Sequence, residues 1–291
     1  MTGTASGEII AAHGRHYLAD CGPAGFVLCV PRGKKSLHAC GDRVTVRMTA
    51  PGNGVIDQTE PRRSEFFRSA THRTRLIAAN ATQVALVVAA EPSFSDEFVA
   101  RALIASEIQG LKSLIVLNKS DIAGAFAAAR ERLLPFAQAG YRLVELSARQ
   151  DVEPLRQQLR GEVTVLTGQS GMGKTTMINS LVPDTDAATR EISRFLDSGR
   201  HTTTAARLYR LDAATALIDC PGLQEFGLAH LAFGDIEWGF PEFRPLIGQC
   251  RFRDCRHQAE PDCAIRAAVA EERIHPRRYE LFRRIAAGAM A

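Results

Sequence analysis

The first third of the chain shows short stretches in which apolar and polar positions follow a strand-like pattern. Residues 44–48 (VTVRM) alternate with a period of two, and residues 25–30 form a short apolar run. Residues 54–57 continue the pattern directly after a turn-forming Pro-Gly-Asn-Gly cluster. Short runs bounded by glycine and proline are typical of β-strands. Four or five such strands in about 65 residues predict a small β-barrel.

From about residue 75 the pattern changes, because helical stretches now separate the β-rich runs. The helical stretches cover residues 98–109 and 124–140, and the β-rich runs lie at 84–90, 114–117, 143–146, 163–166 and 216–218. Strands that alternate with helices of this length predict an α/β fold, with a mostly parallel sheet and helices on both faces. Beyond about residue 230 the strands stop, which predicts a helical third part. We therefore expect domains at 1–68, 69–228 and 229–291.

The composition of the 291 residues is that of a globular protein, with 45% hydrophobic and 23% charged residues, which excludes a disordered or fibrous chain. No apolar run approaches the roughly 20 residues needed to cross a bilayer, so we expect no membrane contact. The start (MTGTASGEII) lacks a secretory pattern, so a cytoplasmic location is expected. The net charge of +4 still allows a local polyanion-binding patch. The arginines after residue 264 are a candidate for it, although a solvated helix face is the plain alternative.

Residues 168–175 (GQSGMGKT) match the phosphate-binding pattern GxxxxGK[ST], between a predicted strand and an apolar helical stretch. Glycines let successive backbone N–H groups turn around phosphates, and the helix N-terminus adds the positive end of its dipole. Lys174 is expected to reach the β- and γ-phosphates and Thr175 to bind Mg²⁺. An incidental glycine-rich turn is the weaker alternative. The predicted nucleotide-binding residues here are Gly168, Gln169, Ser170, Gly171, Met172, Gly173, Lys174, Thr175 and Thr176.

A second polar motif, made by Asn118, Lys119, Ser120 and Asp121, follows a buried strand. The carboxyl edge of a parallel sheet is where a base-binding loop belongs. A carboxylate at Asp121 can accept hydrogen bonds from N1–H and the exocyclic amine of guanine, a donor pair that adenine lacks. The Ser147-Ala148 pair after the next strand matches a motif that contacts guanine O6. The pattern favours GTP over ATP, and thus argues against a P-loop ATPase or nucleotide kinase.

Two further segments fit a γ-phosphate sensor. Asp219 and Gly222 frame an Asp-x-x-Gly motif at the end of a strand, where the Asp is expected to support Mg²⁺ and the Gly N–H to sense the γ-phosphate. Residues 199–204 (GRHTTT), here called the switch segment, lie between this motif and the phosphate loop. Thr202 and Thr203 are both candidate Mg²⁺ ligands, and an ordinary polar turn is the alternative.

The cysteines point to a metal rather than to disulfides, because three of the seven fall within fourteen residues and a reducing cytoplasm disfavours disulfides. Cys250, Cys255, His257 and Cys263 offer three thiolates and one imidazole. A closed tetrahedral set of this kind predicts one structural Zn²⁺. Free thiols or a redox pair are the remaining possibilities.

The order of the nucleotide motifs is the small-GTPase order cut between its third and fourth elements. With this order the sequence resembles the ribosome small-subunit-dependent GTPase A family (RsgA, also called YjeQ), circularly permuted GTPases of bacteria. The resemblance covers nearly the whole chain and rests on GDRVTV, EPRRSEFFR, NKSD, GQSGMGKTT, GRHTTT, DCPG, EFGL and the cysteine cluster. It differs at Cys220, where Thr or Ser is expected, and in a very short N-terminal extension, so that a basic RNA-binding tail is not expected.

The resemblance implies an OB-fold barrel, a permuted GTPase domain and a zinc-bearing helical domain. It also implies GTP hydrolysis that the small ribosomal subunit stimulates during late maturation, with rRNA and GTP or GDP as partners of a monomer. Leu223 stands where many GTPases have a water-orienting Gln, so intrinsic turnover should be slow. His201 resembles the family's candidate for positioning water, although it could be a solvated loop histidine. A non-catalytic, GTP-liganded RNA-binding assembly factor is the alternative function.

Overall fold

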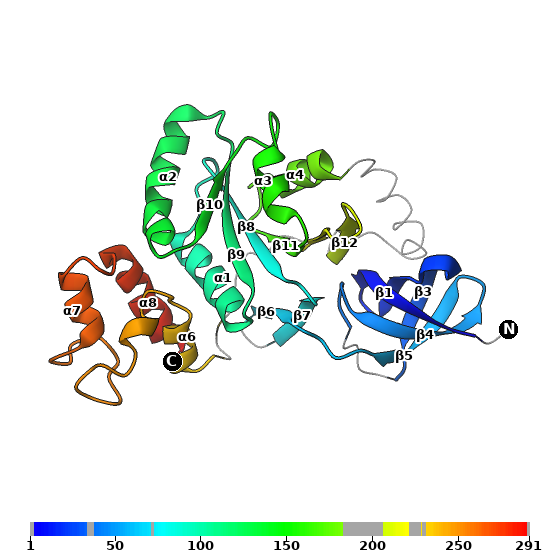
Figure 1. The fold of residues 1–291 in the computed structure, drawn as a ribbon, viewed down its shortest axis with the longest axis horizontal. Coiled ribbons are helices and arrows are strands. Elements are labelled where there is room, and N and C mark those ends of the chain that lie inside the picture. The colour runs from blue at the N-terminus through cyan, green and yellow to red at the C-terminus, as the bar shows by residue number, and fades with distance from the viewer. Residues whose placement is uncertain are drawn as a thin grey trace.

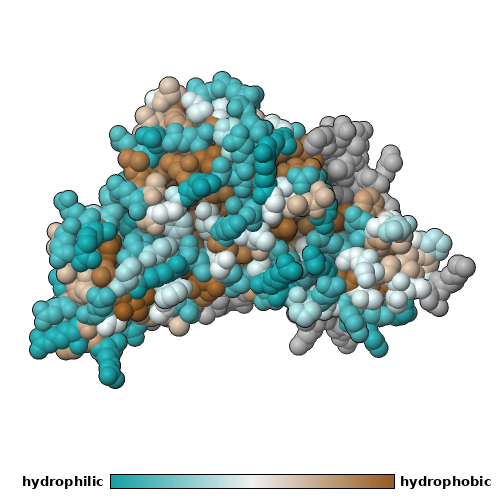
Figure 2. Space-filling model, in the orientation of Figure 1, coloured by the Kyte–Doolittle hydropathy of each residue, from teal (hydrophilic) through white to brown (hydrophobic). Residues whose placement is uncertain are grey.

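The computed structural model describes residues 3–33, 38–70, 73–182, 206–220, 228 and 231–289. These residues form a barrel, a central α/β part and a helical C-terminal part, which follow one another along the long axis of the molecule (Figure 1). Within the described ranges, every helix is too short or too polar to cross a membrane. On the face shown in Figure 2, hydrophobic residues gather over the α/β part, whereas the outer edge of the C-terminal part is hydrophilic.

The N-terminal part is the expected barrel. Its strand order β1-β2-β3-β5-β4 closes through an additional antiparallel pairing of β1 with β4, and only β3 and β5 pair in parallel. The inward positions are apolar, so that Ile9, Val27 and Val46 are all fully buried. The strands are β1 (Thr4–His13), β2 (His16–Asp20), β3 (Phe26–Pro31), β4 (Arg43–Ala50) and β5 (Asn53–Thr59), with a short 3₁₀ helix at Gly22–Ala24.

A buried ion pair fixes the chain where it leaves the barrel. The Asp42 side chain is fully buried and accepts hydrogen bonds from Arg62 Nε at 2.7 Å and from Arg62 Nη2 at 2.9 Å. The same carboxylate accepts the backbone N–H of Ala39 at 2.8 Å. Two charge-assisted bonds and a backbone bond satisfy its oxygens, which is the condition under which a buried charge is tolerated. The hairpin of β6 (Glu65–Ala70) and β7 (Arg73–Ala79) follows directly.

The central part confirms the α/β expectation. The strands β10-β9-β8-β11-β13 pair in parallel in that order, and they begin and end within two residues of the apolar runs in the sequence. In Figure 1 the helices α1 and α2 lie on one side of this sheet and α3 and α4 on the other. The strands are β8 (Gln83–Ala89), β9 (Lys112–Asn118), β10 (Arg142–Glu145), β11 (Val163–Thr167) and β13 (Ala216–Asp219). The helices are α1 (Asp96–Ile108), α2 (Ala123–Gln138), α3 (Glu153–Leu159) and α4 (Lys174–Leu181).

One strand joins the barrel to the central sheet. The strand β12 (Ala206–Arg210) pairs antiparallel with β13 on one side and with β1 of the barrel on the other, where Ala11 lies opposite Arg207. An ion pair between Glu8 and Arg210 supports the same junction. The two parts therefore share one eleven-stranded sheet, a connection that no local sequence pattern predicted.

The C-terminal part contains α6 (Phe233–Trp238), a 3₁₀ turn at Arg244–Leu246, α7 (Ala264–Ala270) and α8 (Pro276–Ala289). Its small core consists of aromatic rings: Phe282 meets Phe240 edge-on at 5.5 Å and Phe243 at 4.9 Å between ring centroids. Helices α6 and α8 both pack on α1. The C-terminal part therefore packs directly against the central part.

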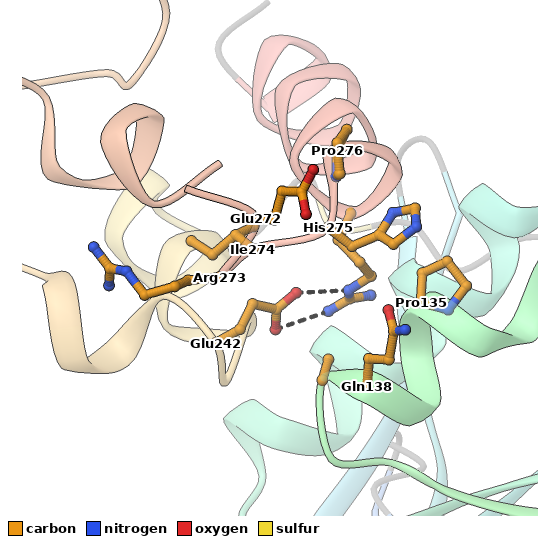
Figure 3. A pocket seen from close by; sticks show the side chains of 10 residues that line it. Pro135, Gln138, Glu242, Glu272, Arg273, Ile274, His275 and Pro276 are labelled. Carbon is orange, nitrogen blue, oxygen red and sulfur yellow. Dashed lines mark hydrogen bonds and ion pairs between the residues drawn. The ribbon is translucent and has the colours of Figure 1, made fainter. Parts of the chain in front are cut away.

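The seam between these two parts contains a buried ion pair (Figure 3). Arg278 of α8 is 2% exposed and donates to the Glu242 carboxylate at 2.7 and 3.2 Å. Its guanidinium lies 4.8 Å from the ring centre of Phe136, a residue of α2. A cavity of about 490 Å³ opens beside the pair, between α2 and residues 272–276. Arg278 is therefore neither a solvated residue nor free to bind a polyanion, unlike the general expectation for the C-terminal arginines.

Candidate nucleotide and metal sites

The phosphate loop lies between β11 and α4, as the GxxxxGK[ST] pattern predicts. Gly168 has a φ of 150°, and a Cβ atom there would lie 2.2 Å from the carbonyl oxygen of Val87. Gly173 has a φ of 94°, and a Cβ atom there would lie 2.2 Å from Asn118 Nδ2. Both positions exclude side chains by space as well as by conformation. The two outer glycines of the motif are thus explained by packing against β8 and against the Asn118 amide.

Lys174 begins α4 and turns back over the loop. Its ammonium group donates to the carbonyl oxygens of Gly168 at 2.7 Å and Gln169 at 2.8 Å. Burial lowers the pKa of Lys174, while Asp219 acts in the opposite direction. Burial likewise raises the pKa of Asp219, and the Lys174 charge opposes that shift. Asp219 lies opposite Leu166 in the parallel pairing of β13 with β11, so both charged groups lie at the carboxyl edge of the sheet.

Asn118 connects three loops. Its Nδ2 donates to the carbonyl oxygen of Met172 in the phosphate loop at 2.9 Å, and its Oδ1 accepts the backbone N–H of Ala148 at 2.9 Å. The side chain is 2% exposed, so these bonds are shielded from water. Lys119 adds a second link, because its ammonium donates to the carbonyl oxygen of Gly171 at 3.0 Å. The motifs at 118–121, 147–148 and 168–175 thus form one site.

Asp121 lies at the open side of this site. A hydrogen bond from the Ser147 side chain lowers its pKa, with a smaller contribution from Arg149, so the carboxyl group is held in its ionised, acceptor form. Ser120 donates its backbone N–H to the carbonyl oxygen of Leu146 at 3.2 Å. The loop is thus fixed to the end of β10, with the Asp121 carboxylate available to a hydrogen-bond donor.

Several predicted residues lie outside the described ranges. His201, Thr202, Thr203 and Gly222 all belong to segments that the structure leaves undescribed. Thr175 and Thr176, in contrast, lie in the first turn of α4 beside Lys174.

The four predicted metal ligands come together in the C-terminal part. Ligand atoms of Cys250, Cys255, His257 and Cys263 all lie within 4.8 Å of one another. His257 directs Nδ1 to the three sulfur atoms, at 3.5, 3.5 and 3.2 Å. Cys255, His257 and Cys263 are buried. Three sulfurs and one imidazole nitrogen converging on one buried point fit the donor set of a structural Zn²⁺ site.

Glu237 is a functional candidate that the sequence reasoning missed. Its Oε1 lies 2.6 Å from Nε2 of His257, so the imidazole proton sits on Nε2 and leaves Nδ1 facing the sulfurs. Although burial opposes it, the hydrogen bond to Glu237 raises the pKa of His257. Glu237 belongs to α6 and lies outside the cysteine spacing pattern, so no sequence signal pointed to it.

A short chain of contacts links the phosphate loop to the C-terminal part. The Gln169 side-chain oxygen accepts the backbone N–H of Ser95 at 3.2 Å, and Ser95 caps α1. The next residue, Asp96, binds Arg132 of α2 at 2.6 Å and Arg277 of α8 at 2.7 Å. One carboxylate therefore joins α1, α2 and α8 within one residue of a phosphate-loop contact.

The parallel sheet carries a phosphate loop and a guanine-type base loop at its carboxyl edge, in permuted order. This arrangement defines a circularly permuted GTPase, to which a barrel and a candidate metal module (residues 250–263) are added. The family model for the RsgA GTPase matches residues 59–229. This chain belongs to the RsgA GTPase family.

The relatives carry the same family name. The chain is 51% identical over 281 residues to the small ribosomal subunit biogenesis GTPase RsgA of Nitrosospira multiformis, which covers 97% of this chain and 90% of that protein. It is 52% identical over 285 residues to the protein of the same name from Burkholderia pseudomallei, at 96% and 90% coverage.

Two solved structures share the fold over nearly the whole chain. YjeQ from Thermotoga maritima superposes with a TM-score of 0.76 at 26% identity and covers 99% of both chains. YloQ, described as a circularly permuted GTPase, superposes with a TM-score of 0.71 at 22% identity, covering 99% of this chain and 96% of that one. At that identity, the second match supports the fold alone.

Proposed function

We propose that this chain hydrolyses GTP in a reaction stimulated by the small ribosomal subunit, and that it acts as a late maturation factor of that subunit by binding its rRNA. The observation that carries the proposal is the Asn118 side chain, which ties the phosphate loop to both base-recognition loops. The relatives that are about half identical over most of the chain bear the name of a small-subunit biogenesis GTPase.

The proposed nucleotide contacts follow from the geometry of the site. The N–H groups of residues 168–173 and the start of α4 surround the phosphates, and the Lys174 ammonium moves from the loop carbonyls to the β- and γ-phosphates. Asp121 accepts the guanine N1–H and amine, and Ala148 lies where a backbone N–H meets O6. Thr175 and either Thr202 or Thr203 would hold Mg²⁺, which would neutralise charge on the phosphates. Asp219, at the end of β13, would support this metal site.

Hydrolysis in this proposal is slow until a partner binds. Leu223 cannot orient water, whereas His201 in the switch segment can, once a partner has rearranged that segment. Gly222 senses the γ-phosphate through its N–H. Lys174 and the loop N–H groups supply most of the charge stabilisation in either state. The small subunit would therefore act by rearranging the switch segment, with little change to the phosphate loop.

The metal module has a structural role in the proposal. Zn²⁺ would be held by Cys250, Cys255, His257 and Cys263, and would supply cross-linking rather than chemistry, since no position of a tetrahedral set remains open. Arginines next to the cysteines offset the net negative charge of three thiolates around a divalent ion. Because such small modules gain their folding free energy from the metal, chelation should unfold the C-terminal part locally.

The three parts, which we place at 1–68, 69–228 and 229–291, act as one cytoplasmic monomer in this proposal. The barrel offers few rings for base stacking, because the Phe, Tyr and Trp residues of its strands are Tyr17, which is 1% exposed, and Phe26, which is half-buried. Its contact with rRNA should therefore depend on phosphates and shape, and binding should weaken steeply as salt is raised.

The test is steady-state GTP hydrolysis with and without purified small ribosomal subunits. We expect strong stimulation for the wild type, none for Lys174→Ala, and weakened GTP binding for Asp121→Asn. A His201→Ala variant that binds GTP and subunits but loses the stimulation would support the role of that histidine. Turnover that stays negligible with subunits present, while GTP binding is intact, would instead indicate the non-catalytic assembly factor that Leu223 allows.

A further inference from the structure

The metal-binding loop exposes an aromatic ring that the metal site does not need. Phe252 lies between Cys250 and Cys255 and is 42% exposed. Its contribution to the loop is through the backbone, since its carbonyl oxygen accepts the N–H of Cys255 at 3.3 Å. The ligands, in contrast, are turned inward, with Cys255, His257 and Cys263 each 8% exposed or less.

Exposure of this kind is uncommon in the protein. In the part of the chain that the structure describes, the exposed large apolar side chains are Val30, Leu134, Trp238 and Phe252. Phe252 alone among them lies in an arginine-rich loop, with Arg251 and Arg253 as its sequence neighbours. The other three belong to β3, α2 and α6, outside the metal-binding loop. A protein-binding hot spot would be expected inside a contiguous apolar surface.

A cation lies beside the ring. The Arg251 guanidinium carbon lies 5.6 Å from the Phe252 ring centre, within cation–π range, and Arg251 also binds Asp262 at 3.0 Å. Arg253 and Arg256 make no ion pair with any described residue, and Asp254 is the one acid between them.

The nearby acid Glu260 does not cancel this charge by pairing with an arginine side chain. Its carboxylate accepts the backbone N–H groups of Arg256, Gln258 and Ala259 at 2.8 to 3.0 Å. The loop thus presents one ring followed in the sequence by two arginines, Arg253 and Arg256, that make no ion pair with a described residue. The Arg256 guanidinium lies over the Phe233 ring at 4.5 Å.

We infer that Phe252 is a stacking platform for an unpaired RNA base, with Arg253 and Arg256 on the flanking phosphates. An aromatic face next to cations is the arrangement by which proteins hold single-stranded nucleic acid: the ring stacks on any base and the cations bind the backbone. The inference deepens the proposed function and rests on it for the identity of the RNA, which would be an unpaired segment of the small-subunit rRNA. It also assigns base stacking to the C-terminal part, while the barrel, with few rings in its strands, contributes phosphate contacts.

The test compares Phe252→Ala with Phe252→Tyr and with Leu134→Ala, which removes an equally exposed apolar side chain from α2. Binding is measured to purified small ribosomal subunits, in the presence of a non-hydrolysable GTP analogue, and to a labelled single-stranded RNA of roughly 12 nucleotides. Zinc content and thermal unfolding of each full-length variant show whether the loop is intact.

We expect Phe252→Ala to weaken binding to both probes by roughly 5- to 150-fold, the value of one stacked base. Phe252→Tyr and Leu134→Ala should bind like the wild type. The slope of log affinity against log salt should stay unchanged in Phe252→Ala, because the ring is uncharged, and should fall by roughly one unit or less in Arg253→Ala.

Undiminished RNA binding by a zinc-loaded Phe252→Ala variant overturns the inference. So does a variant that loses subunit binding but keeps oligonucleotide binding, since the ring would then contact a protein. A wild type that binds the oligonucleotide through Phe252 but ignores the subunits would refute the proposed function and leave the stacking role standing. Wild-type protein that binds neither probe would refute both.

Discussion

Replacing Asn118 by Ala should separate the organisation of the nucleotide site from the stability of the fold. The change removes one donor and one acceptor, and it leaves the Met172 carbonyl and the Ala148 N–H buried without partners. Each orphaned group costs about 1–3 kcal/mol, so the free energy of unfolding should fall by about 2–6 kcal/mol. The two loops would also have to be ordered by the nucleotide. Fixing even one backbone residue costs about 1–2 kcal/mol, which lowers the affinity for GDP by roughly 5- to 30-fold.

Fluorescent GDP titration and urea unfolding measure the two effects, and Asn80 provides a matched control. Its side chain also spans two segments, since it accepts the N–H of Arg63 at 2.9 Å and donates to the Gly41 carbonyl at 2.8 Å, remote from the nucleotide loops. Because Asn80 has a φ of 57°, the control variant is Asn80→Gly. It should lose stability but keep GDP affinity. Equal loss of affinity in both variants, or loss of stability alone in Asn118→Ala, would refute the reasoning.

Three further outcomes are expected. Glu237→Ala should lower the zinc affinity about 10- to 100-fold in a chelator competition, and Glu237→Gln should lower it less, since Gln still accepts a hydrogen bond. Equal zinc affinity in the wild type and both variants would exclude an orienting role for Glu237. Arg278→Met leaves the Glu242 carboxylate partly buried without its cation, so the free energy of unfolding in urea should fall by about 3–5 kcal/mol. The double variant with Glu242→Leu should regain most of this free energy, and a double variant as unstable as the single one would contradict the reasoning. Burial lowers the pKa of His38 below its ordinary 6.5, so the unfolded chain takes up the proton first as the pH falls. Stability that is present above pH 6.5 is therefore lost as the pH falls towards the folded-state pKa. Urea midpoints measured on both sides of pH 6.5 should show this loss of stability in the wild type and a smaller loss in His38→Gln, and identical pH dependence of the two proteins would refute the role of His38.

Local sequence patterns were sufficient for the parts of the site whose residues are consecutive. The phosphate loop could be predicted because Gly168, Gly173 and Lys174 meet requirements set by one turn and one helix start. The clustering of Cys250, Cys255, His257 and Cys263 could be predicted because all four residues occupy a single loop. The strand positions followed from buried apolar runs, since a parallel sheet covered on both faces gives each strand a continuous apolar signal.

The features that could not be predicted depend on residues far apart in the chain. Glu237 reaches His257 only because α6 packs beside the metal loop, and Asp96 meets Arg277 across 181 positions. Arg278 looked like one more surface arginine, because helix periodicity does not distinguish a solvated face from a face covered by another domain. Its burial depends on Phe136 and Phe240, which lie in two other segments.

The pairing of β12 with β1 has a consequence for the barrel's independence. A strand at the end of a sheet presents unpaired N–H and C=O groups, which readily recruit a strand from another molecule. In this protein β1 pairs with the edge of β12 that would otherwise be the end of the central sheet. The strand β12 begins at Ala206, four residues or fewer after the candidate threonines at 202 and 203. A variant that lacks the barrel would expose the hydrogen-bonding edge of β12, directly after the switch segment. Such a variant would tend to self-associate through that edge. The barrel thus shields the nucleotide domain from its own copies, and it can be removed only together with a replacement for that edge.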